Sequence, residues 1–284
     1  MAFGRPGLFL ALGLLCAAAP QAKPPDAATY GDRILVQKDI AFGDKPHQKL
    51  DLYLPKGEGP FPLAVCWFGG GFTGGNKSGM ARVGAFLASK GIAAAAPGYF
   101  LADPKGEPPG WPTNVRDAKA AVRFLRSKSG EYRFDATRIA ALGHSSGAYL
   151  ALMVGLTPHL RELDGEEPGS SAVVAVVDIA GVCDRRKSLG TGTLALLGKG
   201  FEEKDDLRAL ASPILYVGPK SPPIYILHGE QDKTVDVSSA RQLDEALEKA
   251  GVLRKLHLLP SGGHDPITLE ALESIAEWLK ERLK

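Results

Sequence analysis

Short apolar runs alternate along the chain with longer stretches in which apolar residues recur at helical spacing. One helical face contains Ala118, Ala121, Val122 and Leu125, and the stretch from Leu269 to Leu283 has the same periodicity. The short apolar runs are Ile34–Phe42, Leu50–Leu54, Leu63–Phe68, Ile92–Ala96, Ile139–Leu142, Val173–Ile179, Ile224–Leu227 and Leu253–Leu259. Continuously apolar strands separated by helices predict an α/β fold, with a mostly parallel sheet of about eight strands and helices on both faces.

The first two apolar runs follow each other without an intervening helix, so we expect them to form an antiparallel edge. We find no internal repeat, and the length of 284 residues suits a single large domain once an N-terminal segment is removed. We assign residues 33–284 to this domain and residues 23–32, which are rich in Pro and Ala, to a linker.

Residues 1–22 have the pattern of a secretory signal peptide. Arg5 supplies a positive charge, Leu8–Leu15 form a short apolar core, and small residues follow. The apolar core is too short for a stable membrane span, so we expect a secreted or periplasmic protein whose cleavage site stays open. A buried N-terminal helix is the alternative. Lipid anchoring at Cys16 is less favoured, because Leu15 is a poor residue before a lipidated cysteine.

Composition excludes several classes of function. The 34 basic and 32 acidic side chains give a net charge of +2, which provides no electrostatic surface for nucleic acid. The three cysteines, Cys16, Cys66 and Cys183, are too few for a disulfide scaffold and lack C-x-x-C metal spacing. The unusual feature is the number of glycines, 34, several of which fall in the motifs described next.

The strongest motif is Gly143-His144-Ser145-Ser146-Gly147, which follows the apolar strand 138–142 and precedes the apolar helix 148–156. A G-x-S-x-G motif in a strand–turn–helix setting is typical of a nucleophilic serine on a tight, strained turn. The turn raises the Ser145 hydroxyl above the carboxyl edge of the sheet and places the Ser146 N–H at a helix N-terminus. We therefore predict Ser145 as the nucleophile.

A serine nucleophile needs a histidine base, and His264 is the best candidate because it lies in a Gly-rich turn between the last strand and the last helix. His228 ends a strand, where packing explains it. His144 precedes the serine on the tight turn, and we expect the geometry of the turn to point the histidine side chain away from the serine. The other three histidines, with no chemical partners nearby in the sequence, are His47, His159 and His257.

The carboxylate that orients the histidine is predicted to be Asp232, at the carboxyl end of the strand Ile224–Leu227. Asp236 and Glu230 are competitors, and Asp236 also suits the N-cap of the helix that follows. The order serine, aspartate, histidine along the chain is the order this hydrolase architecture requires.

A Gly-rich loop, Phe68–Lys77, follows the third apolar run and contains three consecutive glycines. Glycines let backbone N–H groups turn toward an approaching oxygen without a Cβ in the way. A phosphate-binding loop is the rival interpretation, but the G-x-x-x-x-G-K-[ST] and G-x-G-x-x-G spacings do not fit.

Together these motifs resemble the α/β-hydrolase superfamily, and within it the small carboxylesterases related to hormone-sensitive lipase and to acetyl-xylan or feruloyl esterases. The resemblance runs from about Leu50 to the C-terminus. The motifs that carry it are Leu50–Pro55, the Gly-rich loop, Gly98–Ala102, Trp111–Leu125, the serine motif, His228–Asp232 and Gly263-His264.

The resemblance implies acyl transfer through a serine ester, without a metal or organic cofactor, on a small-molecule or polysaccharide-linked ester. It implies the catalytic residues Ser145, Asp232 and His264, with oxyanion-hole donors from the N–H groups of Gly70, Gly71 and Ser146. One departure is Phe68, which stands where the family's loop normally opens with histidine. We expect this change to affect the support of the loop rather than its backbone donors.

Two questions stay open at this level. Residues 185–212 interrupt the strand–helix rhythm and form either a lid over the pocket or a surface excursion. The alternatives to an esterase are an amidase or peptidase of the same fold, kynurenine-formamidase-like or prolyl-oligopeptidase-like, and a non-catalytic binding protein of this fold. The non-catalytic alternative predicts a damaged triad, whereas the sequence supplies all three residue types.

Overall fold

The structure is a computed structural model that describes residues 1, 22–165 and 168–284. The predicted signal peptide, 1–22, lies outside the described residues except for its two end positions. The domain itself is built on one eight-stranded sheet with the order β1-β2-β4-β3-β5-β6-β7-β8. This confirms the predicted α/β architecture.

The eight strands coincide with the eight apolar runs of the sequence. They are β1 (Ile34–Ala41), β2 (Lys49–Pro55), β3 (Phe61–Trp67), β4 (Ala93–Pro97), β5 (Phe134–His144), β6 (Ala175–Ile179), β7 (Ile224–Gly229) and β8 (Arg254–Leu259). Strands β3 to β8 run parallel, whereas β1 pairs antiparallel with β2 and β2 antiparallel with β4. The predicted antiparallel edge is therefore present, and all carboxyl ends of the parallel strands meet at one edge of the sheet.

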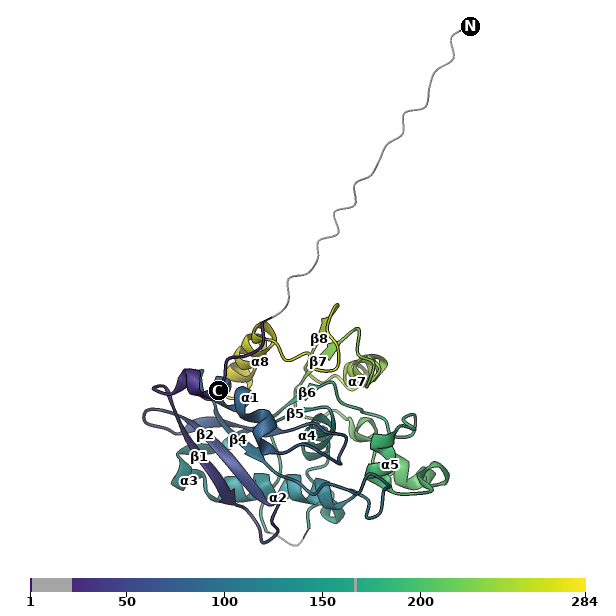
Figure 1. The fold of residues 1–284 in the computed structure, drawn as a ribbon, viewed down its shortest axis with the longest axis horizontal. Helices are drawn as coiled ribbons and strands as arrows, with labels where there is room; N and C mark the ends of the chain where they lie inside the picture. The colour runs from purple at the N-terminus through teal and green to yellow at the C-terminus, as the bar shows by residue number, and fades with distance from the viewer. Residues whose placement is uncertain (2–21, 166–167) are drawn as a thin grey trace.

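Helices cover both faces of the sheet (Figure 1). They are α1 (Ala81–Ser89), α2 (Thr113–Ser127), α3 (Ser129–Tyr132), α4 (Ser146–Leu156), α5 (Thr191–Leu197), α6 (Asp205–Leu210), α7 (Ser238–Lys249) and α8 (Leu269–Arg282). Helices α1 and α8 contact each other on one side, and α2 contacts α4 on the other. Both sides of strands such as β4 and β6 are therefore buried, which explains why their sequences are apolar without alternation.

Helix α4 is the most deeply enclosed helix with eight or more described residues, since all eleven of its residues are buried. It packs on β3, β5 and β6. Its first turn approaches the end of β3 so closely that a Cβ at Gly147 would overlap the carbonyl oxygen of Trp67. The packing of α4 and the close approach of Gly147 to β3 thus fix the turn between β5 and α4.

The segment after β6 departs from the strand–helix alternation, as the sequence predicted. It contains α5 and α6 and is tied to the rest of the fold by an apolar face, because Ala195, Leu196 and Leu197 are buried. Backbone N–H groups of Gly110 and Trp111 donate to carbonyls of this segment at 2.9 and 2.8 Å. Through these contacts, α5 is packed against the rest of the domain.

The described part of the chain shows neither a membrane-spanning helix nor a metal cluster. Among those residues, no helix has both the length and the apolar character that crossing a bilayer demands. The same residues hold no group of three or more His, Cys, Asp or Glu side chains arranged to bind a metal ion.

We predict that Gly147→Ala destabilises the fold by about 2 kcal/mol or more, because overpacking against backbone atoms leaves no room for relaxation. This outcome opposes helix propensity, which favours Ala over Gly by about 1 kcal/mol. The measurement is urea unfolding, with Gly130→Ala in α3 as the control, because a Cβ there meets nothing within 4 Å. Equal stability of the two variants would contradict the prediction.

Candidate active site

Ser145 sits on a sharp turn between β5 and α4. Its backbone has φ 55° and ψ −118°, a conformation that costs a non-glycine residue about 1–3 kcal/mol. The turn is held by a hydrogen bond from the Ser145 N–H to the carbonyl of Ile179 at 2.8 Å, which connects it to the end of β6. The turn therefore places the Ser145 hydroxyl at the carboxyl edge of the sheet, as the motif predicted.

The three residues predicted as a catalytic triad lie within hydrogen-bonding distance of one another. His264 Nε2 is 2.9 Å from Ser145 Oγ, and His264 Nδ1 is 2.8 Å from Asp232 Oδ2. With a neutral imidazole, Nδ1–H donates to the carboxylate and Nε2 accepts the serine proton. This arrangement suits general-base activation of a hydroxyl.

The Asp232 carboxylate is buried and has several donors. Its Oδ1 accepts from the N–H groups of Thr234 and Val235 at 2.7 and 3.0 Å. Burial alone would raise the pKa of Asp232, but the hydrogen bonds from His264, Val235 and Thr234 outweigh burial and hold the pKa below its usual value. The carboxylate is therefore ionised at neutral pH and able to orient His264.

The two competing carboxylates have other partners. Glu230 forms an ion pair with Arg241 at 2.7 Å. Asp236 accepts from the N–H of Ser238 at 2.8 Å, while the N-cap of α7 is Val237 rather than Asp236. Neither carboxylate is hydrogen-bonded to a histidine ring.

Two histidines that the sequence analysis did not place in the triad contact the site. His228 is fully buried, and its Nε2 lies 2.9 Å from the Val235 carbonyl and 3.2 Å from Asp232 Oδ2. Its N–H therefore helps to fix the loop that carries the carboxylate. The four-residue spacing of His228 and Asp232 is the signal from which this contact could have been found.

The expectation that His144 is directed away from the site was incomplete. His144 does not touch the serine hydroxyl, but its Nε2 donates to the backbone carbonyl of His264 at 2.8 Å. Burial lowers the pKa of His144, so the ring is neutral and keeps this donor at physiological pH. His144, the residue before Ser145, thus anchors the loop that contains His264.

The Gly-rich loop passes directly over the elbow. Gly70 and Gly71 have φ values of 141° and 62°, which favour glycine, and both line the same pocket as Ser145 and Ser146. The Ser146 N–H belongs to the first turn of α4, where N–H groups have no acceptor within the helix. The Gly-rich loop and the N-terminus of α4 therefore bring backbone N–H donors to the same pocket.

Phe68, which replaces the usual histidine, is supported by Tyr99. The two rings are stacked with centroids 4.4 Å apart. The Tyr99 hydroxyl donates to the Phe68 carbonyl at 3.0 Å and lies 3.2 Å from Ser146 Oγ. A stacked, hydrogen-bonded tyrosine therefore holds the loop in a position that suits its backbone donors.

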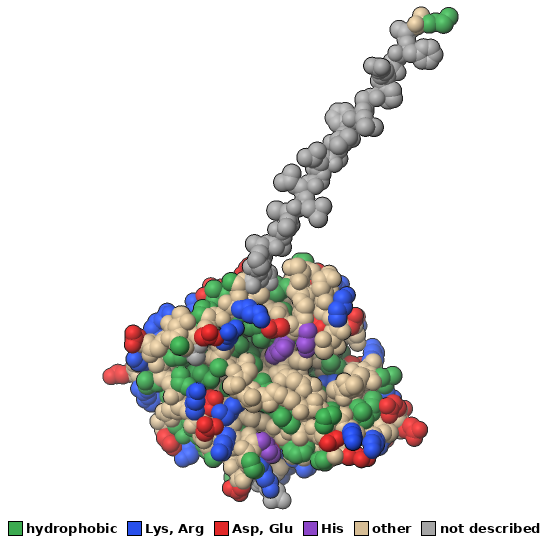
Figure 2. Space-filling model, viewed as in Figure 1, with side chains coloured by type: hydrophobic (Ala, Val, Ile, Leu, Met, Phe, Trp, Pro, Cys, Tyr) green, Lys and Arg blue, Asp and Glu red, His purple; other side chains and the backbone are tan. Residues whose placement is uncertain are grey.

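A pocket of about 370 Å³ opens at Ser145. Its wall includes Gly70 and Gly71 of the Gly-rich loop, His264, and residues 190–193 of the segment predicted as a lid. Figure 2 shows histidine atoms near the centre of this face and charged side chains of both signs spread around them without a large patch of one sign. The pocket is thus a partly open cleft lined by both polar and apolar groups.

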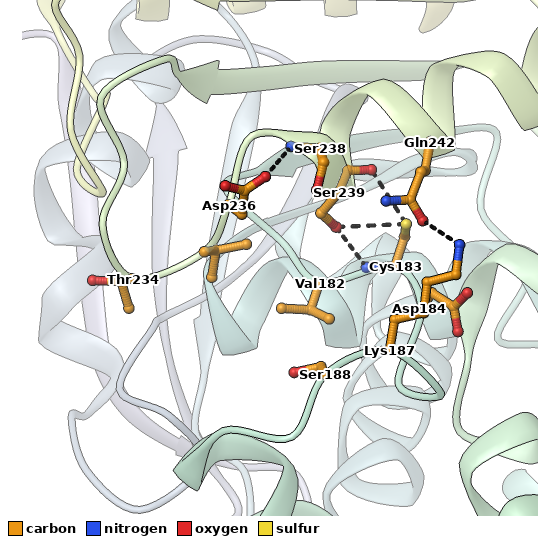
Figure 3. Close-up of a pocket in the computed structure, with 11 residues that line it drawn as sticks. Val182, Cys183, Asp184, Lys187, Ser188, Thr234, Asp236, Ser238, Ser239 and Gln242 are labelled. Carbon is orange, nitrogen blue, oxygen red and sulfur yellow. Dashed lines mark hydrogen bonds between the residues drawn. The ribbon is translucent and has the colours of Figure 1, made fainter.

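A second, smaller pocket of about 180 Å³ adjoins the first (Figure 3). Val182, Ser188, Thr234 and Val235 line both pockets. The remaining wall of the second pocket is mainly polar and includes Lys187, Asp236, Ser238, Ser239 and Gln242. The cleft therefore continues past the Asp232 loop with groups that form hydrogen bonds.

Comparison with known proteins decides the family. A family model described as BD-FAE matches residues 50–247. The chain belongs to the BD-FAE family. This is an α/β-hydrolase family, and the match confirms the resemblance predicted from the sequence motifs.

The BD-FAE chain is similar to proteins named as esterases. Esterase LipC of Mycobacterium tuberculosis is 28% identical over 87% of this chain. The probable isoprenylcysteine alpha-carbonyl methylesterase ICMEL1 of Arabidopsis thaliana is 26% identical over 83% of it. The chain spans 64% and 52% of the length of these two relatives.

A solved structure described as a truncated form of a carbohydrate esterase from gut microbiota superposes with a TM-score of 0.82 at 24% identity. The match covers 92% of this chain and 99% of that one. This likeness shows the fold of the BD-FAE chain and agrees with its eight-stranded sheet.

Beneath the elbow lies a buried carboxyl group with a different environment. Asp178 on β6 pairs in register with Gly143, and its Oδ1 accepts from the Gly181 N–H at 3.1 Å. Its Oδ2 has no hydrogen-bond partner among the described residues. Burial raises the pKa of Asp178 to about 7, so its charged form is disfavoured in the folded state.

We predict that Asp178 makes the fold less stable as pH rises. An unfolded aspartate ionises near pH 3.8, whereas the folded one ionises at about 7, so stability is fully present below the unfolded pKa and is lost as pH rises through 7. Asp178→Asn removes this dependence. Unfolding free energies measured from pH 4 to pH 8 should shift in favour of Asp178→Asn by a few kcal/mol. A constant difference across this range would contradict the prediction.

Proposed function

We propose that this chain is a serine hydrolase that cleaves carboxylic esters through an acyl-enzyme. The observation that carries the proposal is the continuous hydrogen-bonded chain from Ser145 Oγ through His264 to Asp232, at the mouth of a pocket. We assign Ser145 as the nucleophile, His264 as the base and then the acid, and Asp232 as the orienting carboxylate.

In the proposed reaction, Ser145 Oγ attacks the ester carbonyl while its proton passes to His264 Nε2. The N–H groups of Gly70, Gly71 and Ser146 stabilise the negative charge that develops on the carbonyl oxygen. His264 then gives the proton to the leaving alcohol, which breaks the ester bond and leaves an acyl group on Ser145. Water, activated by His264, attacks this acyl group and releases the acid.

The ester class is supported by the two relatives, which are named as an esterase and a probable methylesterase. We extend the proposal to small-molecule and polysaccharide-linked esters. The support for a larger alcohol is the second pocket, whose hydroxyl and amide groups continue the cleft beyond Ser188 and Thr234. Sugars present many hydroxyls, and such groups bind them by hydrogen bonds.

We also propose that the chain is exported. The support is the sequence pattern of residues 1–22, with residues 23–32 as a linker to a hydrolase domain at 33–284. In that domain, residues 185–212 are proposed to cover the pocket. Their contribution of Ser188 and residues 190–193 to its wall supports this role.

We predict that Ser145→Ala abolishes labelling by a fluorophosphonate probe and lowers kcat/KM for p-nitrophenyl acetate by about 10³-fold or more. His264→Gln should lower kcat/KM to a similar degree, and Asp232→Asn by about 10²–10⁴-fold, because the imidazole then adopts the wrong tautomer. Glu230→Gln, which changes the rejected carboxylate, is the control and should keep wild-type activity.

A wild-type protein that neither reacts with the probe nor hydrolyses the ester would overturn the function. Full activity of Ser145→Ala would overturn the assignment of the nucleophile. p-Nitroacetanilide in the same assay tests the amidase alternative, which predicts that the anilide is cleaved as readily as the ester.

Export predicts that the full chain, expressed in a bacterium with a C-terminal tag, accumulates in the periplasm or medium with roughly 20 residues removed. Leu12→Arg interrupts the apolar core and should retain the chain in the cytoplasm. Cys16→Ser should leave export unchanged, because lipid anchoring is not expected. Cell fractionation with N-terminal sequencing is the measurement, and an unprocessed cytoplasmic product would contradict export.

A further inference from the structure

A buried arginine lies in the active-site pocket, and the triad does not use it. Arg185 follows β6 and is only 3% exposed, yet it lines the same pocket as Ser145 and His264. The proposed ester hydrolysis needs no cation at this place.

The guanidinium is surrounded mainly by aromatic rings. It lies 4.5 Å from the ring centroid of Tyr149 and 5.2 Å from that of Phe72. Among the described side chains, it forms one hydrogen bond, a long one from Nη1 to Thr193 Oγ1 at 3.4 Å. Its Nε has no partner among the described residues.

No carboxylate of the described residues forms an ion pair with Arg185. The nearest acid in the sequence, Asp184, is instead paired with Arg186 through two hydrogen bonds of 2.9 and 2.8 Å. Arg186 is partly exposed, whereas Arg185 is buried. The two adjacent arginines thus have opposite environments, and only the buried one lacks a counter-charge.

A buried charge without a paired carboxylate is costly, and a guanidinium carries five N–H donors. Contacts with aromatic faces offset part of this cost but satisfy no donor. Burial lowers the pKa of Arg185 to about 10, so the side chain still carries its charge at neutral pH. An anion that enters the pocket would supply the missing partner.

We propose that Arg185 binds a carboxylate carried by the substrate, so that the preferred esters are anionic. This inference rests on the proposed esterase function and names its substrate class. Two hydroxyls support the same corner, because Thr193 Oγ1 lies 3.0 Å from Ser188 Oγ and both residues line the pocket. A planar guanidinium matches the fork geometry of a carboxylate, and the Ser188 hydroxyl, which accepts from Thr193, can donate its own proton beside it.

The carboxylate can belong to the acyl part or to the alcohol part of the ester, and matched substrates distinguish the two. Ethyl hydrogen succinate and its neutral amide, ethyl succinamate, test the acyl part through ethanol release. Acetoxyacetate and acetoxyacetamide test the alcohol part through acetate release. The members of each pair differ in one charge and hardly in size.

We expect wild-type kcat/KM to be at least about tenfold higher for the anionic member of one pair, because charge-assisted hydrogen bonds discriminate by this much or more. Arg185→Gln should abolish the preference while leaving hydrolysis of the neutral member within about threefold. Arg185→Lys should keep part of it. Arg186→Gln, the matched control, should leave the preference unchanged, because Arg186 is paired with Asp184.

The wild-type ratio can overturn the proposal even if Arg185→Gln fails to fold. Equal rates in both pairs, or faster cleavage of the neutral members, would overturn it while p-nitrophenyl acetate hydrolysis still supports the esterase function. A preference that survives in folded Arg185→Gln would also overturn it. Absence of hydrolysis of every ester would overturn the proposed function and this inference together.

Discussion

The strained turn at Ser145 is the constraint on which the rest of the site depends. A serine with positive φ persists only where the surroundings hold it, and here three contacts do so. The Ser145 N–H bonds to the end of β6, α4 is buried along its whole length, and Gly147 packs against the backbone of β3. The backbones of β3 and β6, together with the buried helix α4, therefore fix the position of the hydroxyl, and the neighbouring loops pack around it.

Side chains outside the triad connect the neighbouring loops to this turn. His144 holds the carbonyl of His264, and His228 holds the loop of Asp232. On the opposite side, Tyr99 carries the loop that opens with Phe68. Phe68, which stands where the sequence resemblance leads us to expect a histidine, is held by the stacked ring and the hydroxyl of Tyr99.

Burial affects three charged groups at this edge of the sheet in different ways, and the number of partners decides each outcome. Asp232 has several donors and stays ionised. Asp178 has a single donor, so burial raises its pKa toward neutrality. Arg185 remains charged without a carboxylate beside it. Arg185 lies in the pocket of this BD-FAE chain and takes no part in the hydrogen-bonded chain of Ser145, His264 and Asp232.

The local sequence determined the strands, the main helices and the serine elbow, because apolar periodicity and a Gly-flanked turn are properties of neighbouring residues. It also determined Ser145, Asp232 and His264 as candidates from their order and their places at strand ends. Only the tertiary structure decided the roles of His144, Tyr99 and Arg185. Their partners lie 120, 31 and 36 residues away in the chain, and such contacts arise from packing between distant segments.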